Sequence, residues 1–425
     1  MRMHSFTKKL LVLALLCNLF AASPANVKAD TAAELQQNIN SHAEKIKQLD
    51  AEIKTYQKQI EVVGGEAKNL QNAIQVLDIN QKKIGTEIKK TETNIQKTNL
   101  TIEQLGSDID VIRSKISSNS LAIAKTLSIM QQNDSESLVE SFLKNRTLAD
   151  VVNDYESMGE FESQVRAKSM ELDTFRGELE VKKTSTESEK KKLQSLNGEL
   201  KDQNQILLNN KKEKNTLLAE TKNKETEYKS ILATRQAEKE KFEKELFDFE
   251  SRLKRVIDPN SFPSGGKGII SYPLDSIVVT QAFGATVDAK RLYVSGTHNG
   301  VDFRATRGTP VKSVSGGVVK GIGNTDEQPG CYSYGKWILI DHDNGLSSLY
   351  AHLDLIKATP GSRVETGEVI GYSGQTGYAT GPHLHLTLYA SQGVEIQKYS
   401  ASINCKNVSI PVASSKAYLD PMQYF

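Results

Sequence analysis

The sequence predicts a multidomain protein in which a long antiparallel α-helical coiled-coil hairpin is followed by a mainly antiparallel β domain. Only 38% of the 425 residues are hydrophobic and 6% are aromatic, which is low for a fully globular chain. Glycine and proline are scarce between residue 30 and about residue 257, and frequent afterwards. Five of the seven histidines and the single tryptophan, Trp337, lie at or after residue 298. A polar, elongated middle and a compact C-terminal domain account for this uneven distribution.

Residues 1–29 are expected to be a secretory signal peptide. Arg2, Lys8 and Lys9 form a basic start, an apolar stretch of about 13 residues follows, and small residues precede Asp30. A stable membrane span needs about 20 residues, so an uncleaved anchor is the less favoured alternative. We therefore expect an exported protein, located in the periplasm or at the extracellular face of the cell wall.

Net charge limits the classes of partner, and the cysteine content limits the possible disulfides. Removing residues 1–29 deletes four basic groups and no acidic group, so the formal net charge changes from +2 to −2. A nearly neutral chain lacks the basic surface of a nucleic-acid-binding protein, and we expect no nucleic acid partner. Two cysteines remain, Cys331 and Cys405, and an exported protein allows either a disulfide or two free thiols.

The coiled coil is predicted over residues 30–254. A first apolar seam with 3-4 spacing runs over residues 35–123, and only five of its 26 positions are not apolar. A patchier seam over residues 165–253 has Lys182, Glu189 and Lys214 at positions that should be dry. These charged positions have three possible explanations: looser packing, room for a partner, or an imperfect solvated coil.

The two seams have equal lengths of 89 residues, and each could reach about 130 Å as one helix. Equal arms around a different segment favour an antiparallel hairpin over a parallel dimer of one continuous rod. The glycine pair at 64–65 predicts a local bend in the first arm. Residues 127–161 are denser in apolar side chains and off the heptad, which predicts a tip of short amphipathic helices that pack on themselves or on a partner.

Residues 255–272 are rich in proline and glycine and are expected to be a linker. The remaining residues, 273–425, contain short β-branched runs separated by glycines, such as "KWILIDH" (336–342) and "SSLYAHL" (347–353). This pattern predicts a mainly antiparallel β domain.

Five side chains of this domain could form a metal site. "THNGVDF" contains His298 and Asp302, "LYAHLD" contains His352, and "GPHLH" contains His383 and His385. Alternate residues of a strand face the same side, so the two histidines of H-x-H project together, although an isolated pair of this kind is more often structural. A catalytic zinc usually takes three protein ligands, and two imidazoles with a carboxylate suit it. The two remaining histidines would then act on water and substrate.

These motifs, with "VTQAFG" and "GEVIGYSGQTGYATGPHLHL", resemble the M23, or lysostaphin-like (LytM), zinc metallopeptidases, which cleave peptide bonds of peptidoglycan. The resemblance covers about residues 270–425. It implies that His298, Asp302 and His385 bind Zn²⁺ and that His352 and His383 are the catalytic histidines.

The upstream arrangement is similar to that of cell-division murein hydrolases and murein hydrolase activators. That resemblance implies a coiled coil that docks on a cell-division ABC-transporter-like membrane complex and holds the hydrolase inactive. We therefore expect a secreted zinc endopeptidase that acts on peptidoglycan peptides in wall remodelling or daughter-cell separation. A non-catalytic activator of a separate murein amidase is the alternative, although activators usually have a degenerate metal site.

Two features depart from the family pattern. Leu386-Thr387 stands where members often have Phe-Glu, so support of the metal ligands could differ. Residues 323–337 are longer than the usual turn and include Cys331. This insertion could lie over the groove, be tied to Cys405, or be an ordinary surface insertion.

Overall fold

The computed structural model describes residues 32–63, 69–134, 148–252, 258–293, 295–379, 381–398 and 404–425. The predicted signal peptide, the glycine pair at 64–65, residues 135–147 of the predicted tip and the first part of the predicted linker lie outside these ranges. Within the described ranges, no helix combines the length and apolar character that crossing a membrane requires.

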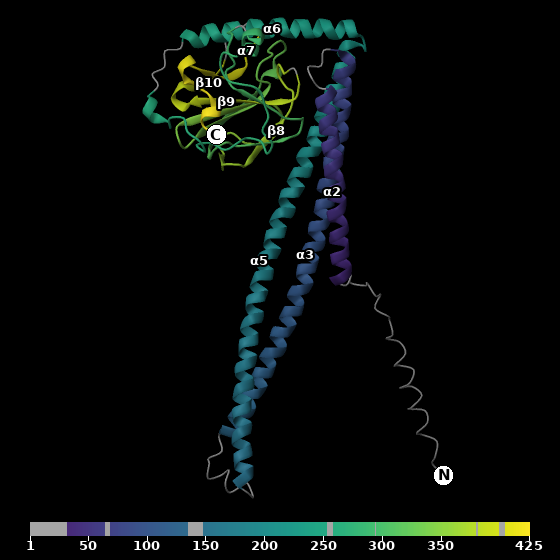
Figure 1. Cartoon of the computed structure of the whole chain (residues 1–425), viewed down its shortest axis with the longest axis vertical. Helices are drawn as coiled ribbons and strands as arrows, with labels where there is room; N and C mark the ends of the chain where they lie inside the picture. The colour runs from purple at the N-terminus through teal and green to yellow at the C-terminus, as the bar shows by residue number, and fades with distance from the viewer. Residues whose placement is uncertain are drawn as a thin grey trace, which may run out of the picture. The chain divides into compact units, whose positions relative to one another are not determined.

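Four long helices make up the N-terminal part of the chain: α2 (Ala32–Val63), α3 (Leu70–Asp134), α5 (Leu148–Thr221) and α6 (Glu225–Arg252) (Figure 1). All four lack proline, and Ile84 of the first predicted seam is fully buried in a cluster with Ile206 of α5 and Tyr372 of the β domain. The chain divides into two compact units. One contains described residues up to 43 together with 97–191, and the other contains residues 44–96 and 192–425.

Helices α3 and α5 pair antiparallel within each unit. In the first unit, Lys182 donates to Asp108 over 2.7 Å, and Lys115 lies 5.2 Å from the centre of the Phe175 ring. In the second unit, α3 and α5 contact each other through two further pairs, Thr91 with Glu199 and Asp78 with Lys214. Residue numbers fall in α5 as they rise in α3. The predicted antiparallel coiled-coil hairpin is therefore confirmed.

Each of the two predicted arms consists of two helices. The first seam is divided between α2 and α3, and α2 lies antiparallel along α3, with Asp50 2.5 Å from Lys90. The second seam is divided after Thr221, because Lys222 and Asn223 adopt left-handed backbone angles (φ 48° and 56°) that end α5 and begin α6 in a new direction. The 3-4 spacing continues across both breaks and does not reveal them, although the glycine pair at which a bend is predicted lies between α2 and α3.

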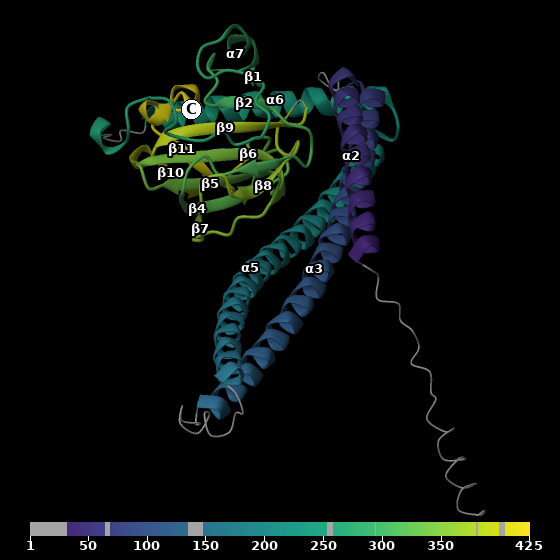
Figure 2. The same cartoon turned by 60° about the horizontal axis from the view of Figure 1, so that its bottom comes forward.

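The C-terminal part is a mainly antiparallel β domain, as predicted. Its main sheet has the order β1 (Val279–Gln281), β2 (Val301–Arg304), β9 (His383–Ala390), β6 (Leu346–Ile356), β5 (Lys336–His342), β4 (Gly317–Asn324) and β7 (Arg363–Val364). Strand β8 (Val369–Ser373) pairs with β6 and with β3 (Pro310–Lys312), and β12 (Tyr418–Leu419) pairs with β9. A second sheet contains β10 (Val394–Lys398) and β11 (Ser409–Ala413), and a short helix, α7 (Val287–Leu292), follows β1. Figure 2 shows β9 between β2 and β6.

The core of the β domain lies on one face of β9. Leu384, Leu386 and Leu388 pack there with Phe303 and Tyr350, all fully buried. Ile270, from the predicted linker, is also buried in this core. The boundaries at residues 254 and 272 stay predictions.

Candidate metal centre

Neighbouring strands bring the three predicted ligands together. Asp302 on β2 lies directly opposite His385 on β9, and His298 precedes β2 in an isolated bridge with Gly284. Asp302 Oδ1 lies 2.9 Å from His385 Nδ1 and 3.4 Å from His298 Nε2, and the two nitrogens are 3.1 Å apart. All three residues are buried.

These residues fit a zinc ion. Ligand atoms about 2.0–2.1 Å from a tetrahedral Zn²⁺ are about 3.4 Å from one another, close to the separations of this cluster. Two imidazole nitrogens and one carboxylate oxygen are also the donors that zinc prefers. A Cβ at Gly300 would lie 2.8 Å from His385 Cε1, so the chain leaves room there for the ligand ring.

In each of the two ligand histidines, the ring nitrogen that faces away from the cluster contacts an oxygen atom of the protein. His298 Nδ1 lies 3.2 Å from the carbonyl oxygen of Ala282, and His385 Nε2 lies 2.8 Å from Thr387 Oγ1. These contacts leave His298 Nε2 and His385 Nδ1 directed at the cluster. Thr387, one of the departures from the family pattern, thus supports a predicted ligand instead of leaving it without a partner.

Electrostatics favour a carboxylate and neutral imidazoles in the cluster. Burial by itself would raise the pKa of Asp302, but His383, His298 and His385 hold that pKa well below its usual value. Burial lowers the pKa of His385, against the opposing effect of Asp302. An ionised Asp302 and a neutral His385 are the protonation states that a divalent cation requires.

The two predicted catalytic histidines lie beside the cluster. The ring centres of His352 on β6 and His383 on β9 are 4.7 Å apart, and His383 Nε2 is 3.8 Å from Asp302 Oδ1. His352 Nδ1 lies 2.8 Å from the carbonyl oxygen of Thr376, and His383 Nδ1 lies 2.9 Å from that of Gly381. Burial, followed by the proximity of His383 and His385, lowers the pKa of His352 well below its usual value. The structure therefore brings all five predicted residues together.

His342 lies outside this group. Its Nε2 is 2.7 Å from Ser348 Oγ and its Nδ1 is 3.2 Å from the carbonyl oxygen of Gly316. Burial lowers the pKa of His342 to about 4, so the ring stays neutral within the sheet. These contacts give His342 a structural role within the sheet.

A cavity of about 410 Å³ adjoins the five residues, and helix α6 forms part of its wall. Lys239, Phe242 and Leu246 of α6 line the cavity together with His298 and His383. The sequence pattern does not predict that α6 lines this cavity, because the second seam assigns Phe242 and Phe249 to contact with another helix. Phe242 and Leu246 are instead buried against the β domain, in a cluster with Cys331, Cys405, Val408, Ile410 and Val412.

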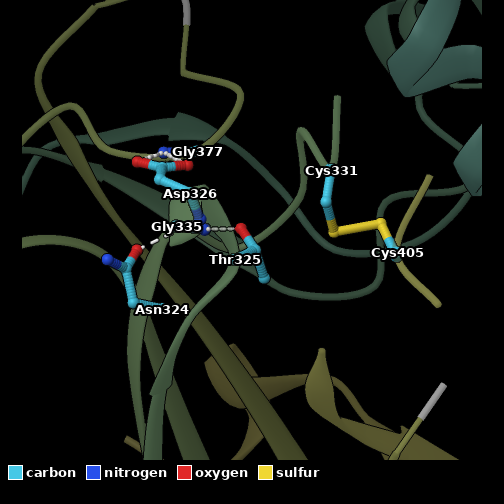
Figure 3. Close-up of a disulfide and its surroundings, with 7 residues drawn as sticks. All are labelled: Asn324, Thr325, Asp326, Cys331, Gly335, Gly377 and Cys405. Carbon is cyan, nitrogen blue, oxygen red and sulfur yellow. Dashed lines mark hydrogen bonds between the residues drawn. A yellow bond between two sulfur atoms is a disulfide. The ribbon is translucent and has the colours of Figure 1, made fainter. Parts of the chain in front are cut away.

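The insertion at 323–337 also reaches the cavity. Cys331 forms a disulfide with Cys405, which settles the alternative that the sequence left open (Figure 3). Tyr332, Ser333 and Tyr334, which follow Cys331, line the cavity. The insertion is therefore both tied to Cys405 and part of the groove.

Comparisons with known proteins agree with this site. Residues 296–398 match the model of peptidase family M23. The DD-carboxypeptidase/endopeptidase Mpg of Neisseria meningitidis is 43% identical over 21% of this chain and 19% of its own length. The peptidoglycan DD-endopeptidase ShyA of Vibrio cholerae is 35% identical over 34% of this chain and 30% of its own length. The glycyl-glycine endopeptidase ALE-1 of Staphylococcus capitis is 42% identical over 21% of this chain and 24% of its own length.

The chain thus spans less than a third of the length of each of these relatives. The matched residues include His298, Asp302, His352, His383 and His385, the five side chains of the cluster and its surroundings. The region from 296 to 398 is therefore a domain of peptidase family M23.

Proposed function

We propose that this protein is an exported zinc-dependent endopeptidase that hydrolyses peptide bonds of peptidoglycan during wall remodelling or daughter-cell separation. The observation that carries the proposal is the convergence of His298, Asp302 and His385 beside two further histidines, the buried His352 and the partly buried His383. The named activities of the relatives support peptidoglycan peptides as the substrate class.

His298, Asp302 and His385 would hold the metal, and His352 and His383 would handle protons. Zinc in this position supplies Lewis acidity, which makes water a better nucleophile at neutral pH and polarises a carbonyl. Because the Nδ1 atom of each of the other two histidines faces a backbone carbonyl, Nδ1 carries the hydrogen and Nε2 keeps its lone pair. As water adds to the scissile carbonyl, its proton passes to one Nε2, and that Nε2–H then protonates the leaving amine nitrogen.

Removal of one ligand tests the metal role. We expect the full-length protein to release muropeptides from peptidoglycan with zinc, and to lose this activity after chelation or in His385→Ala. Loss of a zinc ligand is expected to lower the rate at least about 100-fold. Mass spectrometry of the released fragments measures the activity and identifies the cleaved bond. His42→Ala, which changes a histidine on α2, is the matched control.

The same experiment separates the proposal from the activator alternative. A zinc-loaded chain that releases no fragments but stimulates a murein amidase would establish the activator and remove the hydrolase. Equal rates for wild type and His385→Ala would also contradict the proposal.

We further propose that α6 regulates the site. Phe242 and Leu246 bury apolar surface against the β domain, and α6 supplies one wall of the cavity that substrate would enter. Lys239 adds cation–π contacts, with its Nζ 4.6 Å from the Tyr293 ring centre and 4.5 Å from the Tyr378 ring centre. Docked α6 therefore restricts the cavity, and undocking opens it.

A charge on the docked face of α6 tests this regulation. Leu246→Asp places a carboxylate in an apolar contact, which weakens docking by about 2–4 kcal/mol. We expect hydrolysis by the full-length protein to increase at least about 10-fold. Lys244→Asp, on the exposed face of α6, is the control and should leave the rate unchanged. Identical rates for both variants would argue against an inhibitory helix.

We also propose where the protein is located and what its coiled coil binds. Residues 1–29 would direct export to the periplasm or the outer cell-wall face, and the coiled coil would bind a cell-division ABC-transporter-like membrane complex. Engagement of the coiled coil by that complex would then favour undocking of α6. Cofractionation of the full-length chain with such a complex, lost on deletion of residues 127–161, measures this binding.

A further inference from the structure

We propose that Asp326, in the insertion at 323–337, is a positioning residue for His352 and acts through the peptide bond between Thr376 and Gly377. The inference rests on the proposed role of His352 in peptide hydrolysis. Asp326 touches neither the predicted metal ligands nor His352 directly, and it belongs to the segment that departs from the family pattern.

One peptide group connects the carboxylate with the imidazole. The backbone N–H of Gly377 donates to both carboxylate oxygens of Asp326, with distances of 3.0 Å to Oδ1 and 2.9 Å to Oδ2 (Figure 3). The carbonyl oxygen of Thr376, at the other side of the same planar group, lies 2.8 Å from His352 Nδ1. A negative charge on the N–H polarises the peptide group and makes its carbonyl oxygen a stronger acceptor.

This connection determines how His352 faces the cavity. A carbonyl oxygen can only accept, so the hydrogen of the neutral imidazole stays on Nδ1 and the lone pair stays on Nε2. The same insertion also holds the backbone of this residue, because the His352 N–H donates to the carbonyl oxygen of Tyr334 over 2.8 Å. His352 has a left-handed φ of 60°, which a non-glycine residue keeps only when its surroundings hold it there.

The loop around Gly377 is fixed by contacts that do not need Asp326. Thr376 Oγ1 accepts from the Lys336 N–H at 2.9 Å and donates to the carbonyl oxygen of Leu353 at 2.8 Å. Gly377 has a φ of 71°, and a Cβ there would lie 2.2 Å from the carbonyl oxygen of Ser333. Loss of the Asp326 carboxylate is therefore expected to weaken orientation of the peptide group without unfolding the loop.

The turn that carries Asp326 is similarly anchored by its neighbours. Asn324 Oδ1 accepts from the Asp326 N–H at 3.2 Å, and Thr325 Oγ1 accepts from the Gly335 N–H at 2.9 Å (Figure 3). The disulfide between Cys331 and Cys405 holds the following part of the insertion. These contacts fix the turn and thereby hold the Asp326 carboxylate next to the Gly377 N–H.

Three substitutions in full-length protein carrying Leu246→Asp test the proposal. Asp326→Ala removes the acceptor, Asp326→Asn keeps one oxygen but no charge, and Glu327→Ala changes the next acidic residue of the same turn. With zinc, we expect Asp326→Ala to lower kcat about 10-fold at unchanged KM and melting temperature. Asp326→Asn should retain more activity, and Glu327→Ala should match the parent.

Nitrogen-15 NMR of histidine-labelled protein provides a readout that does not depend on activity. His352 resonances, assigned with His352→Gln, should report a hydrogen on Nδ1 in the parent and a weakened Nδ1–H hydrogen bond in Asp326→Ala. Unchanged His352 resonances, or equal kcat for Asp326→Ala and Glu327→Ala in an active parent, would overturn the proposal. A parent chain that hydrolyses nothing while the resonances still change would contradict the proposed function and leave the positioning role supported.

Discussion

His383 and His385 occupy one face of β9 because the alternate residues of that strand supply the core. Leu384 and Leu386 face the buried cluster, so the intervening positions point to the opposite side, toward Asp302 and His298. Asp302 and His385 are paired in register, which brings their side chains within contact distance. The H-x-H spacing and the strand pairing therefore account together for the positions of two of the three predicted ligands, Asp302 and His385.

A side chain at Gly300 would collide directly with the ring of the predicted ligand His385. In Gly300→Ala, the added Cβ would lie 2.5 Å from the Leu386 carbonyl oxygen and 2.8 Å from His385 Cε1, so the ligand ring must move. We expect zinc affinity to fall about 10-fold or more, with a loss of unfolding free energy of about 1–3 kcal/mol.

Competition with a chromophoric zinc chelator measures the affinity of Gly300→Ala, and thermal unfolding measures its stability. Gly316→Ala is the matched control, because the nearest atom to its added Cβ is at an ordinary 3.7 Å. Equal zinc affinities in the two variants would mean that the close approach at Gly300 has no bearing on the metal centre.

At the scale of elements, α6 is distinguished by a buried acid within its apolar contact. Glu250 Oε1 accepts from the Ala413 N–H at 3.0 Å and from the Tyr418 hydroxyl at 2.8 Å. Burial raises the pKa of Glu250 from its usual 4.5 to about 7, although these two hydrogen bonds oppose the shift. With the proposed undocking of α6, this shift predicts that docking depends on pH.

The direction of this pH dependence follows from the protonation of Glu250 in the docked and in the undocked helix. Below pH 4.5 Glu250 is protonated in both states, so docking is strongest there. Between pH 4.5 and about 7 docking takes up a proton and weakens as the pH rises, and above about 7 it stays at its weakest.

We expect hydrolysis by the full-length protein to rise from pH 5 to pH 8 relative to the Glu250→Gln variant, whose helix stays docked. The ratio of their rates cancels the pH dependence of the site itself. Hydrogen exchange of α6 amides in the two proteins, compared at each pH, measures docking independently. A ratio that does not change with pH would exclude Glu250 as the titrating group.

At the scale of the whole molecule, one buried arginine joins helices to the β domain. Arg307 is fully buried, lies 2.5 Å from Asp354 on β6 and forms an ion pair with Glu213 of α5. Lys83 of α3 donates to the Arg307 carbonyl oxygen over 3.0 Å. Residues 44–96 and 192–221 are therefore part of the unit that contains the peptidase domain, whereas the sequence assigned them to a separate coiled coil.

Local sequence patterns predicted both fold classes, which the structure confirms, and the five residues of the candidate site, which the structure brings together. A 3-4 apolar repeat, β-branched runs between glycines, and the closely spaced H-x-x-x-D and H-x-H motifs are local patterns, and each reflects local geometry directly. Pairing between strands β2 and β9 places Asp302 opposite His385, and a bridge with Gly284 positions His298.

Three features depend on the packing of the folded chain: where the helices reverse, which surface covers α6, and whether Cys331 pairs with Cys405. An apolar stripe shows that a helix buries one face but does not identify the surface that buries it, so Phe242 was assigned to a helical seam although it packs on the β domain. Likewise, the contact between Asp326 and Gly377 joins residues 51 positions apart, and such contacts depend on chain packing that no local pattern records.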